Sequence, residues 1–163
     1  SKKLCGKFRK GHFDGVLNVV NRFIEIIRPK YIYLGKKDYQ QLFLIKRHIE
    51  KRKIKSRIVE CETIRENNGV ACSSRNSKLN KNQIKVASNI HNYLKNLKKK
   101  IRKNYNLFNI NKIRKDLISL GANKIDYVEN YNIKSFKRIL KSNKNFNLFF
   151  AYYIKNIRLI DNI

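Results

Sequence analysis

The stretch Tyr31–Gln41, YIYLGKKDYQQ, predicts the fold of the first half of the chain. Its apolar start, Tyr31–Leu34, has the length and composition of a short buried strand. A helical pattern follows over Tyr39–Arg52, and a second strand is predicted at Arg57–Cys61. Strand, helix and strand within about 30 residues form a βαβ unit, whose parallel strands are joined by a right-handed crossover.

The flanking segments extend this organisation. Before the βαβ unit, Phe13–Arg28 has the apolar spacing of a helix and stops ahead of Pro29. Asn80 and Gln83 then resemble a capping box. The elements predicted after it are a long helix ending in the basic run Lys98–Lys103, a helix at Asn111–Leu120 stopped by Gly121, strands at Ile125–Val128 and Phe146–Ile154, and a short helix at Ile133–Leu140. We therefore expect an α/β domain over residues 1–77 and a small α+β domain over residues 78–163.

The net charge of +28 leaves two interpretations open. A basic nucleic-acid-binding module is one of them. The other is compositional bias, because Lys, Asn and Ile share A/T-rich codons and the lysines are scattered over every segment instead of lining one face. We favour bias, with no specific nucleic acid partner. The longest apolar run, Leu148–Ile154, is too short for a membrane span, so no membrane partner is predicted either.

The three cysteines and three histidines predict no metal centre held by protein nitrogen and sulfur. Cys5, Cys61 and Cys72 are widely spaced and odd in number, with no C-x-x-C pair. The histidines are not at the spacing of zinc ligands. The cysteines are therefore predicted to be thiols in a reducing cytosol.

Two loops leave the carboxyl ends of the predicted parallel strands, where open α/β sheets bind ligands. In the first, Gly35 allows close backbone approach, Lys37 supplies positive charge and the following helix offers unpaired N–H groups to a phosphate. Asp38 is predicted to accept from a ribose hydroxyl; the alternative is that it only caps the following helix, a role compatible with the first. The second loop contains Ser73-Ser74-Arg75, whose hydroxyls and guanidinium suit a phosphate that gains charge during a reaction; a solvated polar loop is the alternative.

Two further polar residues are candidates for a second substrate. Gln41 lies one helical turn beyond Asp38 and could both donate and accept; otherwise it is an exposed helix residue. His12 precedes the first helix, where the helix dipole disfavours protonation, so we expect a neutral hydrogen-bonding role. These residues predict electrostatic stabilisation of phosphoryl or adenylyl transfer in a nucleotide-binding α/β domain.

Four segments in order resemble the pantoate-beta-alanine ligase (pantothenate synthetase) family. They are LCGKFRKGHFDGV at Leu4–Val16, GKKDYQQ at Gly35–Gln41, TIRENNGVACSSRN at Thr63–Asn76 and RLIDN at Arg158–Asn162. The resemblance implies a partial Rossmann-like sheet of the class I synthetase type and a small carboxyl-terminal lid domain. It also implies a cytoplasmic homodimer that uses ATP and Mg²⁺ to join pantoate and beta-alanine through a pantoyl adenylate.

The family motifs imply a role for each matching residue. Lys37, Ser73, Ser74 and Arg75 would act on the phosphates during catalysis. The resemblance implies ATP contacts from Gly35, Lys36, Lys37, Asp38, Ile64, Cys72, Ser73, Ser74 and Arg75, and pantoate contacts from Gln41, Arg9 and His12.

This chain departs from the family pattern in three respects. Lys36 stands where the family usually has Glu, and Lys10 stands where it usually has Pro. The family's amino-terminal portion, with its H-x-G-H phosphate motif, a second pantoate glutamine and the residues near magnesium, has no counterpart in the sequence. We therefore expect the chain to be a carboxyl-terminal piece of such an enzyme and to be inactive alone.

Overall fold

A computed structural model describes residues 3–140 and 145–163. The chain divides into two compact units, Ser1–Thr63 and Ile64–Ile163, and each is described by itself. Within the described residues, no helix combines the length and apolar character that a membrane crossing requires. Cys5, Cys61 and Cys72 are thiols and not disulfide partners, as predicted. The functional division between residues 77 and 78 stays a prediction.

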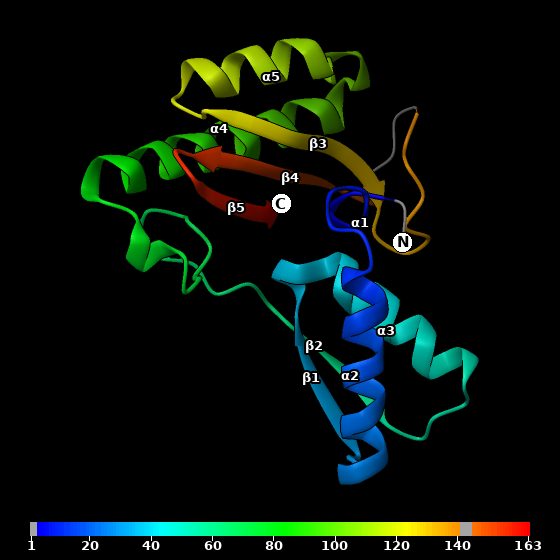
Figure 1. Cartoon of the computed structure of the whole chain (residues 1–163). Helices are drawn as coiled ribbons and strands as arrows, with labels where there is room; N and C mark the ends of the chain where they lie inside the picture. The colour runs from blue at the N-terminus through cyan, green and yellow to red at the C-terminus, as the bar shows by residue number, and fades with distance from the viewer. Residues whose placement is uncertain (1–2, 141–144) are drawn as a thin grey trace. The chain divides into compact units, whose positions relative to one another are not determined.

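The first unit contains the predicted βαβ arrangement (Figure 1). Its elements are α1 (Cys5–Phe8), α2 (His12–Ile27), β1 (Tyr31–Gly35), a 3₁₀ turn η1 (Lys36–Asp38), α3 (Tyr39–Lys51) and β2 (Arg57–Cys61). β1 and β2 are parallel, with Tyr31 opposite Arg57 and Gly35 opposite Cys61. This register brings the carboxyl ends of both strands to one edge, so the predicted parallel pairing is confirmed.

The core of the first unit lies on one face of β1. Ile24 of α2 packs with Ile45 and Ile49 of α3, and Ile32 and Leu34 of β1 contact this cluster. The alternate residues of the strand face the other way: Tyr31 is 43% exposed and Tyr33 is 67% exposed. The prediction of a buried strand was therefore wrong for one face, because successive side chains of a strand point in opposite directions.

The second unit is a small α+β structure, as predicted (Figure 1). It contains η2 (Asn76–Lys78), α4 (Lys81–Lys103), η3 (Tyr105–Leu107), α5 (Ile110–Ser119), β3 (Lys124–Asn132), β4 (Phe146–Ile154) and β5 (Ile157–Asn162). The strands form an antiparallel sheet in the order β3-β4-β5. The capping box of Asn80 and Gln83 is confirmed, and Gly121 ends α5 with φ of +106°.

In the second unit one predicted element was wrong and one strand was missed. Residues 133–140, all of them described, form turns and a single bridge between Arg138 and Tyr131 where a short helix was predicted. The Asn132 side chain accepts from the N–H groups of Lys134 and Ser135, and this local hydrogen bonding favours a turn over a helix. The strand β5, which carries the RLIDN motif, was not predicted.

Polar residues also lie deep in the second unit. The main hydrophobic cluster of this unit includes Ile90 and Leu94 of α4, Leu117 of α5 and Phe150 of β4. Beside it the Arg158 guanidinium pairs with Asp126 over 2.7 Å, and the Asp126 side chain is only 2% exposed. A buried carboxylate needs such a partner, so this pair adds a charged contact between β5 and β3, which are not neighbours in the sheet order β3-β4-β5.

Candidate active site

The GKKDYQQ turn joins β1 to α3 through the 3₁₀ turn Lys36–Asp38. Gly35 has φ of −72° and ψ of 133°, so it does not use the positive φ available to glycine. A Cβ atom at Gly35 would have no described atom within 4 Å. What the glycine provides is an open approach to the backbone at the end of β1, which is the property a bound phosphate or ribose would use.

Lys37 and Asp38 lie beside each other in this turn. Lys37 Nζ is 3.6 Å from Asp38 Oδ2, and the lysine side chain is 17% exposed while the aspartate side chain is 50% exposed. Asp38 occupies the N-cap position of α3, but among the described residues its carboxylate accepts no helix N–H. The capping alternative for Asp38 is therefore wrong. Its carboxylate remains suited to a ribose hydroxyl.

Lys36 pairs with Glu62, the residue that follows β2. The hydrogen bond to Glu62 is the main cause of the raised pKa of Lys36. Because this pair spans the ends of β1 and β2, it confirms that the two loops leave the same sheet edge. It also gives the lysine that replaces the family's usual glutamate an acidic partner in this chain.

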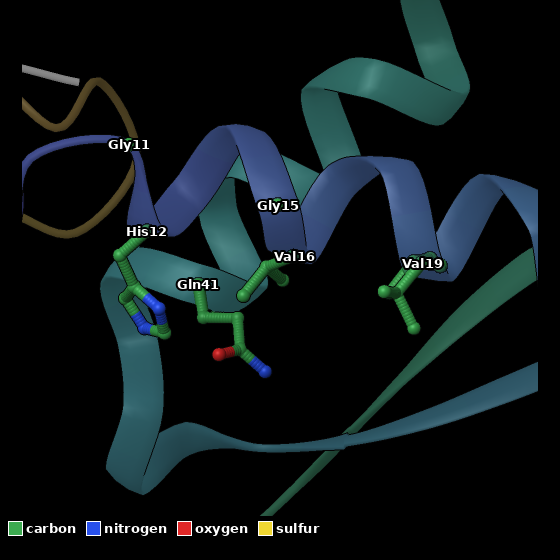
Figure 2. A pocket seen from close by; sticks show the side chains of 7 residues that line it. Gly11, His12, Gly15, Val16, Val19 and Gln41 are labelled. Carbon is green, nitrogen blue, oxygen red and sulfur yellow. The ribbon is translucent and has the colours of Figure 1, made fainter.

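A pocket of about 560 Å³ lies between α2 and the start of α3. Gly11, His12, Gly15, Val16, Val19, Val20 and Gln41 line it. Figure 2 shows His12 and Val16 of α2 directed to the same side as Gln41. The structure therefore brings together two of the three residues predicted to contact pantoate. The wall is largely valine, so the pocket combines apolar volume with two polar side chains.

The surroundings of His12 in this pocket favour its neutral form. Its pKa is lowered first by burial and then by the positive charge of Arg9, and Asp38 opposes the shift. A lowered pKa agrees with the neutral His12 predicted from the sequence. The cause differs, because the prediction rested on the helix dipole whereas the structure shows burial and the charge of Arg9. Arg9 is exposed, and its backbone carbonyl accepts a hydrogen bond from the His12 N–H over 3.3 Å. It influences the pocket as a nearby charge.

The second group of predicted residues lies in the second unit. Ile64 is 76% exposed, and the exposed Cys72 thiol donates to Glu66 Oε1 over 3.4 Å. Ser73 Oγ accepts the backbone N–H of Arg75 over 3.2 Å, which gives Ser73-Ser74-Arg75 the shape of a serine turn. Ser74 and Arg75 are exposed. Two hydroxyls and a guanidinium are thus presented on one tight turn.

The predicted residues therefore form two sets. The turn residues, His12 and Gln41 belong to the first unit, while Ile64 and Cys72–Arg75 belong to the second. That the two sets face each other across a bound nucleotide stays a prediction. Sequence reasoning assigned no role to Arg65, His91 or Asp161, although the Arg65 side chain contacts both of the other two. Arg65 and Asp161 were included only as members of the TIREN and RLIDN segments that resemble the family.

The whole chain, residues 1–163, matches the family model described as pantoate-beta-alanine ligase. The chain belongs to the pantoate-beta-alanine ligase family. Among curated relatives it is 37% identical to pantothenate synthetase of Ruthia magnifica subsp. Calyptogena magnifica, over 98% of this chain and 57% of the relative. It is 39% identical to pantothenate synthetase of Sulfurihydrogenibium sp. (strain YO3AOP1), over 100% of this chain and 59% of the relative.

Solved structures of this family share the fold. The pantoate-beta-alanine ligase of Francisella tularensis, complexed with beta-gamma ATP and beta-alanine, aligns with a TM-score of 0.76 and 34% identity over 99% of this chain and 54% of that one. Pantothenate synthetase of Thermus thermophilus aligns with a TM-score of 0.85 and 26% identity over 99% of this chain and 59% of that one. The chain thus spans a little over half the length of its relatives. The family match favours the ligase interpretation over a nucleic-acid-binding module.

Proposed function

We propose that this chain supplies part of the active site of an ATP-dependent ligase that condenses pantoate with beta-alanine to pantothenate. The observation that carries the proposal is the convergence of His12 and Gln41, from two separate family segments, on one pocket. The first step joins the pantoate carboxylate to the α-phosphorus of ATP and releases pyrophosphate. In the second step the amine of beta-alanine attacks the acyl carbon, and AMP leaves.

The pocket residues suit pantoate. The methyl groups of pantoate would lie against Val16, Val19 and Val20, while the Gln41 amide would hydrogen-bond to its hydroxyl or carboxylate groups. A neutral His12 can accept or donate without adding charge, and Arg9 nearby would attract the anionic substrate. We therefore propose that Gln41, His12 and Arg9 contact pantoate.

The two loops suit ATP. Lys37, Ser73, Ser74 and Arg75 are proposed to stabilise the charge that develops on the phosphates as pyrophosphate leaves. Asp38 would accept from the ribose, and Gly35, Lys36, Ile64 and Cys72 would line the nucleotide. A fixed lysine and arginine act here by position, since neither side chain exchanges a proton in the reaction.

The described residues do not fit a magnesium site made by protein alone. In residues 3–140 and 145–163, no three His, Cys, Asp or Glu side chains gather to hold a metal ion. Magnesium in nucleotide enzymes is commonly held by substrate phosphates, waters and one or two carboxylates, so we propose that it enters with ATP and derive no step through it. The homodimer and the cytoplasmic location implied by the resemblance are likewise proposals, which sedimentation and cell fractionation would test.

The proposal predicts that the chain alone gives no pantoate-dependent exchange between ATP and pyrophosphate. Activity should appear when the chain is joined to the portion of the Francisella tularensis ligase that it does not cover. Radiolabelled pyrophosphate exchange measures both cases. Exchange by the chain alone would contradict the proposal that the chain holds only part of the active site. Absence of exchange in a well-folded joined enzyme would contradict the proposed ligase function.

In the joined enzyme, Lys37→Ala and Arg75→Ala should each cost about 2 to 4 kcal/mol of transition-state stabilisation, measured as kcat/KM. Each change removes a positive charge proposed to lie near the leaving pyrophosphate. Lys78→Ala is the matched control, because this exposed cation lies three residues beyond Arg75 and has no assigned role. Near-normal turnover in both test variants would exclude the proposed phosphate contacts.

A further inference from the structure

The residues before Ser73 form a small hairpin that sets where the serine turn begins. Arg65 and Ala71 make an antiparallel bridge, and the Cys72 N–H donates to the Ile64 carbonyl over 2.9 Å. Nearer the tip, the Glu66 N–H donates to the Val70 carbonyl over 2.9 Å. Cys72 therefore ends one arm of the hairpin, and Ser73-Ser74-Arg75 continues directly from it.

Arg65 fastens the base of this hairpin to the end of β5. Its Nη1 lies 2.6 Å from Asp161 Oδ2 and its Nη2 lies 3.2 Å from Asp161 Oδ1, which is the paired geometry that guanidinium and carboxylate favour. Nη2 also donates to the Asn162 carbonyl, and Nη1 to the Gly69 carbonyl. The Arg65 side chain is 25% exposed and the Asp161 side chain 9%, so water screens this pair little.

His91 of α4 supports the tip of the same hairpin. A Cβ atom at Gly69 would lie 2.5 Å from His91 Cδ2, so the ring and the glycine backbone are in direct contact. Arg65 Nη1 lies 3.4 Å from His91 Nδ1, and His91 is buried. Arg65 therefore contacts both the tip of the hairpin and the helix that supports it.

We propose that Arg65 and Asp161 are positioning residues that hold the hairpin so that Ser73, Ser74 and Arg75 are presented as a preorganised group. The inference rests on the proposed phosphate role of that turn. Preorganised donors stabilise a transition state because they need no rearrangement when charge develops, and displacement by about 1 Å can cost about a hundredfold in rate. Arg65 and Asp161, 96 residues apart in the sequence, thereby link the TIREN and RLIDN segments.

Hydrogen exchange on the 163-residue chain tests the positioning directly. Arg65→Met, Arg65→Lys and Asp161→Asn should each speed amide exchange at residues 72–76 by at least about tenfold, while exchange in the strands of the second unit changes less. Arg65→Lys keeps the charge but loses the paired geometry, so it remains informative if the methionine variant unfolds. Amide exchange at these residues in the double variant Arg65→Lys, Asp161→Asn should be no faster than in the more strongly affected single variant, because both changes break the same contact.

Arg158→Lys is the matched control, since it weakens another arginine–aspartate pair in the same unit without touching the hairpin. In Arg158→Lys, amide exchange at residues 72–76 should increase no more than amide exchange in the rest of the second unit. Unchanged exchange at residues 72–76 in Arg65→Lys and Asp161→Asn would overturn the proposal, as would an increase that only parallels the whole unit.

A kinetic measurement on the joined enzyme distinguishes positioning from general stability. Arg65→Lys should lower kcat about tenfold or more with little change in the KM for beta-alanine, at a temperature where the variant is fully folded. An unchanged kcat would overturn the catalytic part of the inference. If Arg75→Ala is also without effect, the proposed function of the turn fails, whereas the exchange result still reports separately on the hairpin.

Discussion

The two loops assigned to ATP are held in different ways. The turn at Gly35–Gln41 is built from consecutive elements, with β1 before it and α3 after it, and it contacts Glu62, the residue that follows the neighbouring parallel strand β2. The hairpin at Ile64–Cys72 depends on Asp161, at the far end of the second unit's sequence, and on His91. A loop of the first kind follows from local pattern, whereas the second kind requires long-range side-chain contacts.

The same contrast appears in the ion pairs of the two units. In the first unit, Lys46 Nζ lies 3.0 Å from Glu60 Oε1 with side chains 48% and 30% exposed. In the second, Arg158 and Asp126 are 2.7 Å apart with side chains 18% and 2% exposed. Exposed pairs contribute little because water and salt screen them, while a buried charge deprived of its partner is costly. The second unit should therefore be far more sensitive to loss of one charge.

Arg158→Ala should have the largest effect on stability. It leaves the Asp126 carboxylate buried without this guanidinium and should lower the free energy of unfolding by about 3 to 5 kcal/mol. Lys46→Ala, the matched change in the first unit, should cost only about 0 to 1 kcal/mol. Urea denaturation followed by circular dichroism measures both. Equal losses in the two variants would remove the distinction between the units.

Gly69→Ala and Gly15→Ala should have opposite signs. Gly69 has φ of +87° and contacts His91, so alanine adds backbone strain and a steric clash costing about 1 to 3 kcal/mol. Gly15 lies within α2, where a Cβ atom would have no described atom within 4 Å, and alanine should gain about 0.5 to 1 kcal/mol. Thermal unfolding of both variants checks the signs; a stable Gly69→Ala protein would show that the hairpin tip is loosely packed.

The last expected effect concerns Lys98 and pH. Burial, with a smaller contribution from Arg102, lowers the pKa of Lys98 to about 8 from its ordinary 10.5. Between these values the unfolded chain binds more protons than the folded chain, so this lysine makes the free energy of unfolding rise as pH increases. Because the side chain is partly exposed, the rise should be on the order of 1 kcal/mol.

Lys98→Met should remove that rise. The comparison is between the free energies of unfolding of the two proteins at about pH 7.5 and about pH 9.5. Tyrosines and cysteines that titrate in this window are common to both proteins, so their contribution cancels in the comparison. Lys98 Nζ donates to Asn147 Oδ1 over 2.8 Å and lies 5.7 Å from the Phe146 ring, so the methionine side chain keeps much of the packing. A parallel pH dependence in the two proteins would assign the rise to other groups.

Residue pattern alone predicted much of the fold, because helix and strand periodicities depend on neighbouring residues. The bounds of β2 and β4 and the capping box at Asn80 were predicted correctly. The helix expected at Ile133–Leu140 failed because Asn132 forms a local turn. The short strand β5 was missed because its polar residues do not alternate with apolar ones, and two of them are stabilised by partners elsewhere in the chain, Arg65 and Asp126.

The sequence by itself determined the parallel βαβ unit, the family and the identity of the candidate ATP and pantoate residues, since these depend on spacing and motif order. Only the tertiary structure decided that one face of β1 is exposed, that His12 and Gln41 share a pocket, and that Arg65 is held by Asp161. The physical reason is that burial and charge pairing join residues distant in sequence. No local pattern of residue types specifies such pairs.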